Sequence, residues 1–333
     1  MAATLFGAST PASKAVLASM GPLTLAGLLY LGAAVGVLPF SFRGGSPRLM
    51  TRPRHLLRLS GAVLFGGILG PAFLMLGLSR APAASVSLWL NLEVVATAVL
   101  AWALFKEHMH WRTWVAAVFV LGAGILLATP SSPYLTLPVI LVVLACICWG
   151  VDNNLTAMID GYTPAQVTLA KGIVAGSVNL ILGLMMDGPI RDSRMIGWAL
   201  LIGALGYGLS IVLYIAGAQR LGASRSQMLF ATAPFLGGLI SWTALGEPVH
   251  AVQIIAAVIM AAGLSLMLSE RHHHMHVHEA FTHVHFHSHD DGHHDHPHED
   301  SSPNVAHTHE HSHQRDVHSH QHLPDLHHRH NHS

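Results

Sequence analysis

Four charged residues fall inside stretches of sequence that are otherwise apolar, and these are the side chains that could do chemistry. They are Lys14, Glu93, Asp152 and Lys171. An isolated charge at the centre of a membrane helix costs about 2.5–3.5 kcal/mol, so we expect each of the four to be paired or hydrated. Two are basic and two are acidic, which makes internal pairing feasible. A fixed ion pair that only orders the helices is one alternative, and for Lys171 a side chain that reaches the membrane surface is another.

Asp152 is the strongest candidate because it begins a polar run within an apolar stretch. Asn153 and Asn154 follow it directly, and Thr156 lies one turn later on the same helix face. Burial and a nearby lysine act on a carboxylate in opposite directions, so Asp152 or Glu93 is a candidate proton carrier. The asparagines alone fit hydrogen bonds between membrane helices equally well. The predicted pathway for substrate or coupling ion comprises Lys14, Glu93, Asp152, Asn153, Asn154 and Lys171.

The composition indicates that membrane helices must position these side chains. Hydrophobic residues make up 51% of the 333 residues and charged residues only 10%, against about 25% in soluble domains. A hydropathy window of about 19 residues predicts an all-α integral membrane protein with ten transmembrane helices, at 2–20, 22–40, 59–78, 82–104, 112–129, 135–157, 164–186, 195–217, 225–245 and 250–268. Cys146 and Cys148 fall inside one apolar run, and we interpret them as core residues. The sequence contains no nucleophile–base pair, HExxH motif or phosphate loop, so we predict no enzymatic activity.

The basic residues predict the orientation of the chain, since Lys and Arg resist translocation. If the N-terminus is cytoplasmic, three basic residues face outward, namely Arg80, Arg191 and Arg194. Ten face the cytoplasm: Arg43, Arg48, Arg52, Arg54, Arg58, Lys106, Arg112, Arg220, Arg225 and Arg271. We therefore predict a multi-pass protein of the inner (plasma) membrane with both termini in the cytoplasm.

An internal repeat relates the two halves of the apolar region. A shift of 140 positions aligns Gly66 with Gly206, Gly77 with Gly217, Arg80 with Arg220, Ala83 with Ala223, Trp102 with Trp242 and Glu107 with Glu247. Each repeat would hold five helices, so the second would enter the membrane from the opposite side. Inverted repeats of this kind place a substrate site near the midplane between the halves.

In the first repeat, Ser9, Thr10 and Pro11 take the places of the polar run at Asp152, and we expect Pro11 to break its helix. Glu107 and Glu247 end their helices, and we interpret both as boundary or gate-anchoring residues.

Several motifs in the apolar region resemble the drug/metabolite transporter superfamily, EamA type. They are LFGASTPASK, CWGVDNNLT, SLWLNLEVVATAVLAWALFKE and QMLFATAPFLGGLISWTALGEP. The resemblance covers both repeats and implies ten helices in two inverted halves, acting as a secondary carrier that often exports metabolites. Two departures from the family pattern make the halves unequal. The usual proline of the fourth helix is absent near Glu93, whereas the ninth helix has it as Pro234. The basic residue that is frequent early in the second helix is Leu29 here, whereas the seventh helix has it as Lys171.

The C-terminal 62 residues have a different composition, with 24 of the 28 histidines and nine acidic residues. Too few apolar residues remain for a core, so we predict a disordered cytoplasmic tail. Imidazoles and carboxylates bind Zn, Ni, Co or Cu without selecting one. The first candidate ligands, of low specificity, are His272, His273, His274, His276, His278, His283, His285, His287 and His289. The alternatives are a tail that senses pH near 6.5 and a tail that binds metal without a function in the cell.

These observations divide the chain into a first five-helix repeat at 1–130, a second at 131–270 and the tail at 271–333. The leading hypothesis is an ion-coupled carrier that exports a small polar metabolite, with a metal-binding regulatory tail. The alternatives are a carrier of Zn, Ni or Co that uses the tail as a collector, and a membrane metal sensor that transports nothing. The expected partners are a small-molecule substrate, the lipid bilayer and divalent metal ions at the tail, with a second copy of the chain as a further candidate. No cofactor is required and no nucleic-acid partner is expected.

Overall fold

The computed structural model describes residues 1–42, 53–105, 111–128, 136–159, 162–190, 192–221 and 229–268, together with four strands of the tail. The described helices of the first half are α1 (Ala2–Val16), α2 (Pro22–Ser41), α3 (Pro53–Ala62), η1 (Val63–Leu69), α4 (Gly70–Leu78), α5 (Ala83–Trp89), α6 (Leu92–Phe105) and α7 (Trp111–Ala128). Those of the second half are α8 (Thr136–Ala157), α9 (Pro164–Met186), α10 (Arg194–Ile202), η3 (Gly203–Leu209), α11 (Ser210–Leu221), α13 (Ala233–Ala244) and α14 (Ala251–Leu268). η1 and η3 are π-helices.

Local sequence explains where the long helices start. Pro22 is the first residue of α2, where its missing N–H has no helical partner to lose. α9 begins in the same way at Pro164, and the Thr163 hydroxyl accepts a hydrogen bond from the Gln166 N–H while the Gln166 side chain accepts one from the Thr163 N–H. This capping box satisfies two backbone donors at the helix N-terminus. Both starts agree with the predicted boundaries.

Seven of the helical stretches are long and apolar enough to cross a membrane. They are Pro22–Ser41, Arg54–Leu78, Ala83–Leu104, Trp111–Ala128, Leu137–Ala157, Pro164–Met186 and Arg194–Gly217. The other three predicted stretches contain α1, α13 and α14. Within the described residues none of these three helices is long and apolar enough to count as a full span. The protein is therefore a membrane protein with multiple apolar helices, and the count of ten spans stays a prediction.

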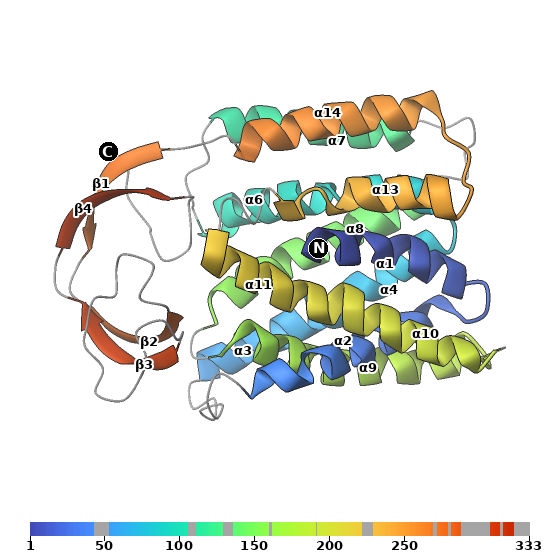
Figure 1. Ribbon diagram of the computed structural model, residues 1–333, viewed down its shortest axis with the longest axis horizontal. Coiled ribbons are helices and arrows are strands. Elements are labelled where there is room, and N and C mark those ends of the chain that lie inside the picture. The colour runs from blue at the N-terminus through green and yellow to red at the C-terminus, as the bar shows by residue number, and fades with distance from the viewer. Residues whose placement is uncertain are drawn as a thin grey trace.

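The helices run side by side along one direction and form a bundle (Figure 1). α2 and α9 pack closely, and residue numbers along the contact rise on one helix as they fall on the other: Thr24 lies against Gly183, Leu31 against Gly176 and Ala34 against Gly172. The two helices are therefore antiparallel. The glycines that repeat along α9 let the two backbones approach.

The first helix of each half packs against the third and fourth helices of the other half. α1 contacts η3 and α13, while α8 contacts η1 and α6. Gly7 of α1 lies against the backbone of Gly237, and Gly150 of α8 lies against the backbone of Thr97. Gly7 and Gly150 are 143 positions apart, and Thr97 and Gly237 are 140 apart. The same close contact thus occurs twice, with the halves exchanged.

The irregular helices also occur in pairs. η1 and η3 start and end 140 residues apart, the shift at which the sequence repeats. α5 and α6 are separated by a turn at Leu90 and Asn91, and a matching turn precedes α13 at 231–232. α1, by contrast, continues through Pro11, so the expected break is wrong. A proline in a membrane helix removes one backbone hydrogen bond but need not end the helix.

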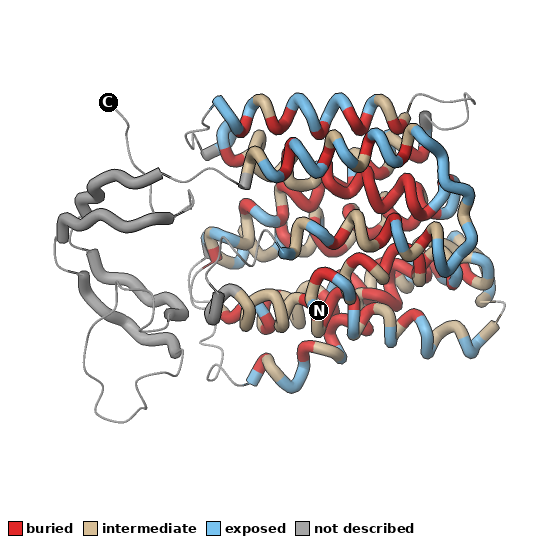
Figure 2. Tube along the Cα trace, turned by 45° about the horizontal axis from the view of Figure 1, so that its top comes forward, coloured by how far each residue is buried: buried red, intermediate tan, exposed pale blue. Residues whose placement is uncertain are grey.

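Buried residues concentrate on the inner helices, and the outer helices alternate between buried and exposed residues (Figure 2). On α8 the exposed large apolar residues are Leu137, Ile140, Leu144 and Ile147. Their spacing of three and four places them on one face. This face is the lipid-facing stripe of α8.

Four strands occur in the tail: β1 (His272–His278), β2 (Phe281–His287), β3 (His307–His313) and β4 (Asp316–His322). β1 pairs with β4 and β2 pairs with β3, both antiparallel. The prediction of a tail without regular structure is not met over these segments. Their alternation of His with Val, Phe and Thr is the period-two pattern of a strand, although a two-stranded ladder is only marginally stable in water.

The contact between α2 and α9 predicts a large effect of a single methyl group. A Cβ at Gly176 would lie 2.8 Å from the Leu31 backbone nitrogen, so we expect Gly176→Ala to lower the free energy of unfolding by about 1–3 kcal/mol. Gly122→Ala is the matched control, because no atom lies within 4 Å of a Cβ there. Thermal unfolding of the two purified variants in detergent measures the difference, and equal melting temperatures would contradict the close packing.

Candidate substrate and ion pathway

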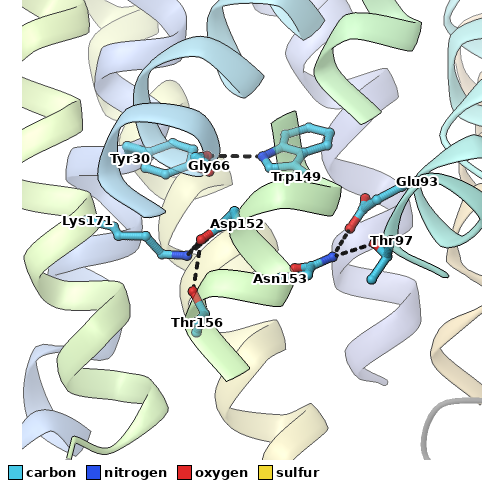
Figure 3. Close-up of polar contacts among 9 residues, drawn as sticks. All are labelled: Tyr30, Gly66, Glu93, Thr97, Trp149, Asp152, Asn153, Thr156 and Lys171. Atoms are coloured by element: carbon cyan, nitrogen blue, oxygen red, sulfur yellow. Dashed lines mark hydrogen bonds and ion pairs between the residues drawn. The ribbon is translucent and has the colours of Figure 1, made fainter. Parts of the chain in front are cut away.

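An ion pair between α8 and α9 lies inside the bundle (Figure 3). Lys171 Nζ contacts Asp152 Oδ1 at 2.9 Å and Oδ2 at 2.7 Å, and the Thr156 hydroxyl donates to Asp152 Oδ1 at 2.9 Å. Only 14% of the Lys171 side chain and 8% of the Asp152 side chain are exposed. The two charges therefore compensate each other at a depth where either alone would be costly.

Gly66 of η1 provides the room for the Asp152 carboxylate. A Cβ on Gly66 would collide with the carboxylate atoms of Asp152, so no other residue type fits here without displacing the ion pair. The Gly66 carbonyl accepts two hydrogen bonds, from the Tyr30 hydroxyl at 2.5 Å and from Trp149 Nε1 at 3.1 Å. The bond from Trp149 is drawn in Figure 3. Side chains from two other helices thus fix η1 at the residue that faces Asp152.

The π-helical turn explains why these carbonyls can accept side-chain donors. A π-turn shifts the backbone hydrogen-bond pattern and leaves groups without an ordinary helical partner. Asn179 of α9 donates to the next two carbonyls, those of Gly67 at 3.1 Å and Ile68 at 3.2 Å. The carbonyls of three consecutive η1 residues are therefore satisfied by α2, α8 and α9, as an apolar environment requires.

A second polar group joins α8 to α6. The Asn153 amide donates to Glu93 Oε1 at 3.0 Å and to the Thr97 hydroxyl at 3.2 Å. The Asn154 amide donates to the carbonyls of Thr97 at 3.1 Å and Gly150 at 2.8 Å. Glu93 lies in the first turn of α6, directly after the turn that separates it from α5. A carboxylate is favoured at a helix N-terminus by the helix dipole.

Asn153 is exposed although it lies deep in the sequence of an apolar helix. At about 100° per residue it projects roughly 120–180° away from each member of the lipid-facing stripe of α8. Its exposed side chain is therefore directed to the inner side of the bundle, where Glu93 and Thr97 lie. Asn153 and Glu93 thus contact each other on the side of α8 that lies away from the lipid-facing stripe.

Lys14 lies elsewhere, in the last turn of α1. Its ammonium donates to the carbonyls of Leu78 at 2.7 Å and Ala81 at 2.9 Å. Lys14 therefore lies at the end of α1 rather than within it, beside carbonyls at the end of α4, and its role in the pathway stays a prediction. The structure brings Glu93, Asp152, Asn153, Asn154 and Lys171 together on neighbouring helices and leaves Lys14 outside the cluster.

Glu247 joins the two halves at a helix terminus. Its carboxylate oxygens accept hydrogen bonds from the N–H groups of Ala83 at 2.7 Å and Ala84 at 2.8 Å, at the start of α5. Gln253 of α14 adds a hydrogen bond to the Ser85 hydroxyl at 3.1 Å. The anchoring role predicted for Glu247 matches these contacts, whereas Glu107 lies outside the described residues.

The side chains of the predicted metal ligands lie outside the part of the chain that the structure describes. Backbone strands include His272, His273, His274, His276, His278, His283, His285 and His287, but their side chains and all of His289 lie outside what the structure describes. In the described helical region no three His, Cys, Asp or Glu side chains come together in a way that could hold a metal ion.

Sequence reasoning missed Tyr30, Thr97 and Trp149, which hold the two polar groups in place. Aromatic residues and threonine are common in membrane helices, so neither residue type marks a site by itself. The sequence feature that could have pointed to this site is Gly66, one of the six residues that recur at the 140-residue repeat shift. A glycine retained in both halves indicates a position where backbone or a charged side chain approaches closely.

A family comparison adds to this geometry. The model of the EamA-like transporter family matches the chain twice, at residues 1–129 and 136–269. The chain belongs to the EamA-like transporter family. This is a family of transporters rather than of enzymes.

Three relatives of the EamA chain match at low identity. An uncharacterized transporter of Methanothermobacter thermautotrophicus is 24% identical over 288 residues, which cover 79% of this chain and 82% of the relative. The uncharacterized transporter YyaM of Bacillus subtilis is 23% identical over 247 residues, covering 70% and 80%. A Pseudomonas aeruginosa protein, PA1977, is 27% identical over 181 residues, covering 54% and 62%.

A solved crystal structure with 17% sequence identity superposes with a TM-score of 0.56 and covers 79% of this chain and 97% of its own. At this identity the likeness shows a shared fold alone.

The ion pair predicts that removing one partner costs more than removing both. We expect Lys171→Met to lower the free energy of unfolding by about 3–5 kcal/mol, because it leaves a buried carboxylate unpaired. The double variant Asp152→Asn/Lys171→Met should recover most of this loss, since no uncompensated charge remains. Thermal unfolding of both purified variants measures the difference. A double variant less stable than Lys171→Met would contradict the pairing.

Proposed function

We propose that the chain is a secondary carrier that exports a small polar metabolite by alternating access, coupled to protons or another ion. The polar cluster of Glu93, Asp152, Asn153, Asn154 and Lys171 is the single observation that carries this proposal. Charged and amide side chains inside an apolar bundle are costly, and in membrane proteins they mark substrate and ion pathways. The resemblance to exporters within the superfamily supports the outward direction.

The proposed architecture is ten membrane helices in two inverted five-helix repeats. Three observations support it: the π-helices recur 140 residues apart, the family model matches twice, and the equivalent helices α2 and α9 are antiparallel. Equivalent helices that run in opposite directions are what inversion requires. The cluster then lies where the halves meet, as expected for carriers built from such repeats.

The proposed location is the inner membrane with both termini in the cytoplasm. The support is the distribution of Lys and Arg, ten on the side of the termini against three on the other.

The Asp152–Lys171 pair should be required for transport but not for folding. We expect Asp152→Asn/Lys171→Met to insert and purify like the parent protein and to lose transport of a metabolite panel in proteoliposomes, because no charged group remains in the cluster next to Glu93. Asp192→Asn, in the turn before α10, is the matched control and should transport normally. Normal transport by the double variant would reduce Asp152 and Lys171 to a structural pair.

The second candidate function is metal binding by the tail, which would then regulate or feed the carrier. The backbone register supports it: His274 is paired with His320 and His276 with His318, and the β2–β3 ladder pairs His283 with His311 and His285 with His309. Residues directly opposite in an antiparallel pair have Cβ atoms about 4.5–5.5 Å apart. Imidazole suits Zn, Ni, Co and Cu. A divalent metal as cargo, and a sensor that transports nothing, are the other outcomes of the test.

Truncation after Arg271 should leave a folded membrane protein that has lost most of its Zn²⁺ or Ni²⁺ binding. Only His55, His108, His110 and His250 remain in that variant. Equilibrium dialysis with Ni²⁺ measures the binding, and a full-length variant with Gln in place of the tail histidines separates the imidazoles from tail length. If the tail regulates transport, metal dependence disappears while basal transport persists. A truncated chain that still bound many ions would contradict the assignment.

A further inference from the structure

Histidine alternates with other residues along the four strands of the tail. Successive residues of a strand lie on opposite faces, and residues two apart share a face. The register therefore places 14 of the 15 histidines in these strands on one face of their own ladder, and His273 is the exception. The outer histidine face belongs to the β1–β4 ladder and the inner histidine face to the β2–β3 ladder, which are separate two-stranded sheets (Figure 1).

Two neighbouring cross-strand pairs form a group of four histidines on each face. The outer tetrad pairs His274 with His320 and His276 with His318, and the inner tetrad pairs His283 with His311 and His285 with His309. Residues directly opposite in such a ladder have Cβ atoms about 4.5–5.5 Å apart, and residues two apart on a strand are separated by about 7 Å. A closed zinc site takes four ligands, and imidazole is one of its usual donors. Sequence spacing alone names no ligand set, whereas the register names one for each ladder.

The opposite faces of the two ladders offer little to hold the strands together. On the outer ladder that face pairs Met275 with Ser319 and Val277 with Val317. So few apolar residues do not make a core, and a two-stranded ladder is marginally stable in water. An ion that needs ligands from both strands stabilises only the paired state, so metal binding and strand pairing are coupled.

The two ladders are nested along the chain. The segment 279–315, of 37 residues, separates β1 from β4, and the inner ladder lies within it. Once β2 and β3 are paired, only the short connections 279–280 and 314–315 remain between the ladders. The cost of closing a loop grows as 1.5RT times the logarithm of its length. Shortening the connection from 37 residues to about six therefore favours β1–β4 pairing roughly 15-fold.

We propose that the tail contains two discrete metal sites, one at each histidine tetrad, and that filling one site tightens the other by about tenfold or more. The ligand class is a divalent ion of the Zn²⁺ type, held by four neutral imidazoles. This inference rests on the metal binding proposed for the tail and specifies its sites. The coupling is reciprocal, so the tail changes from unpaired strands to two ladders over a narrow range of metal concentration. The rival arrangement is independent binding by scattered histidines, in which only their number matters.

Spin labels on the face without the tetrad report pairing of the outer ladder. Met275→Cys and Ser319→Cys occupy opposite positions in the register, and the native Cys146 and Cys148 are buried, so the labels attach to the new cysteines. Zn²⁺ is diamagnetic, and dipolar broadening of the electron paramagnetic resonance spectrum therefore measures the approach of β1 and β4. We expect Zn²⁺ to produce this broadening in the full-length protein in lipid nanodiscs, and EDTA to reverse it.

Replacement of the inner tetrad tests the coupling, because it leaves every histidine of the outer face in place. The variant carries His283→Gln, His285→Gln, His309→Gln and His311→Gln. It should raise the Zn²⁺ concentration at half-maximal broadening of the outer labels by about tenfold or more. The matched control removes the same number of histidines from the segment between β2 and β3, through His293→Gln, His294→Gln, His296→Gln and His298→Gln, and should leave the midpoint unchanged.

Equilibrium dialysis with Zn²⁺ on the same samples separates failure of this inference from failure of the metal-binding proposal. If the full-length protein binds Zn²⁺ without broadening, or if both variants shift the midpoint equally, the tail binds metal but the paired sites are wrong. If the full-length protein binds no more Zn²⁺ than the chain truncated after Arg271, metal binding by the tail fails and the paired sites fail with it.

Discussion

Burial of Asp152 beside Lys171 is the constraint on which the centre of the molecule depends. A carboxylate at this depth needs a cation, a hydroxyl donor and space, and α9, α8 and η1 supply one each through Lys171, Thr156 and Gly66. Because the Lys171 ammonium contacts both oxygens of Asp152, the ion pair ties α8 to α9 at this depth. The surrounding contacts, including the shared Gly66 carbonyl, are arranged around that requirement.

The two halves make an equivalent helix contact with different side chains. Gly66 faces Asp152, and the equivalent Gly206 faces Ser9. A small residue on the π-helix therefore faces the first helix of the other half in both cases, but only one of the two contacts carries a charge. The backbone frame is repeated while the polar groups are gathered on one side, which gives the bundle an asymmetric interior suited to a single site.

Hydropathy and repeat analysis predicted the helices well because both depend on local composition. The starts of α2 and α9 follow from proline and capping residues. The position of Lys14 was not predictable, because its partners are carbonyls from residues 64 and 67 positions away. The π-helices were also missed, since a single inserted residue in a helical turn leaves no clear hydropathy signal. In the tail, composition predicted disorder, while the alternation of histidine with β-branched residues pointed the other way.

The Gly66 carbonyl accepts two hydrogen bonds, and this limits how the bundle can move. It accepts from Tyr30 of α2 and Trp149 of α8 at once. Any motion that separated these helices would leave a hydroxyl, an indole N–H and a carbonyl unsatisfied in apolar surroundings, each at a cost of kilocalories. α2, η1 and α8 should therefore travel as one rigid body. Conformational exchange between the two faces of the membrane would then have to occur at other contacts between the halves, such as that of the Glu247 carboxylate with the first turn of α5.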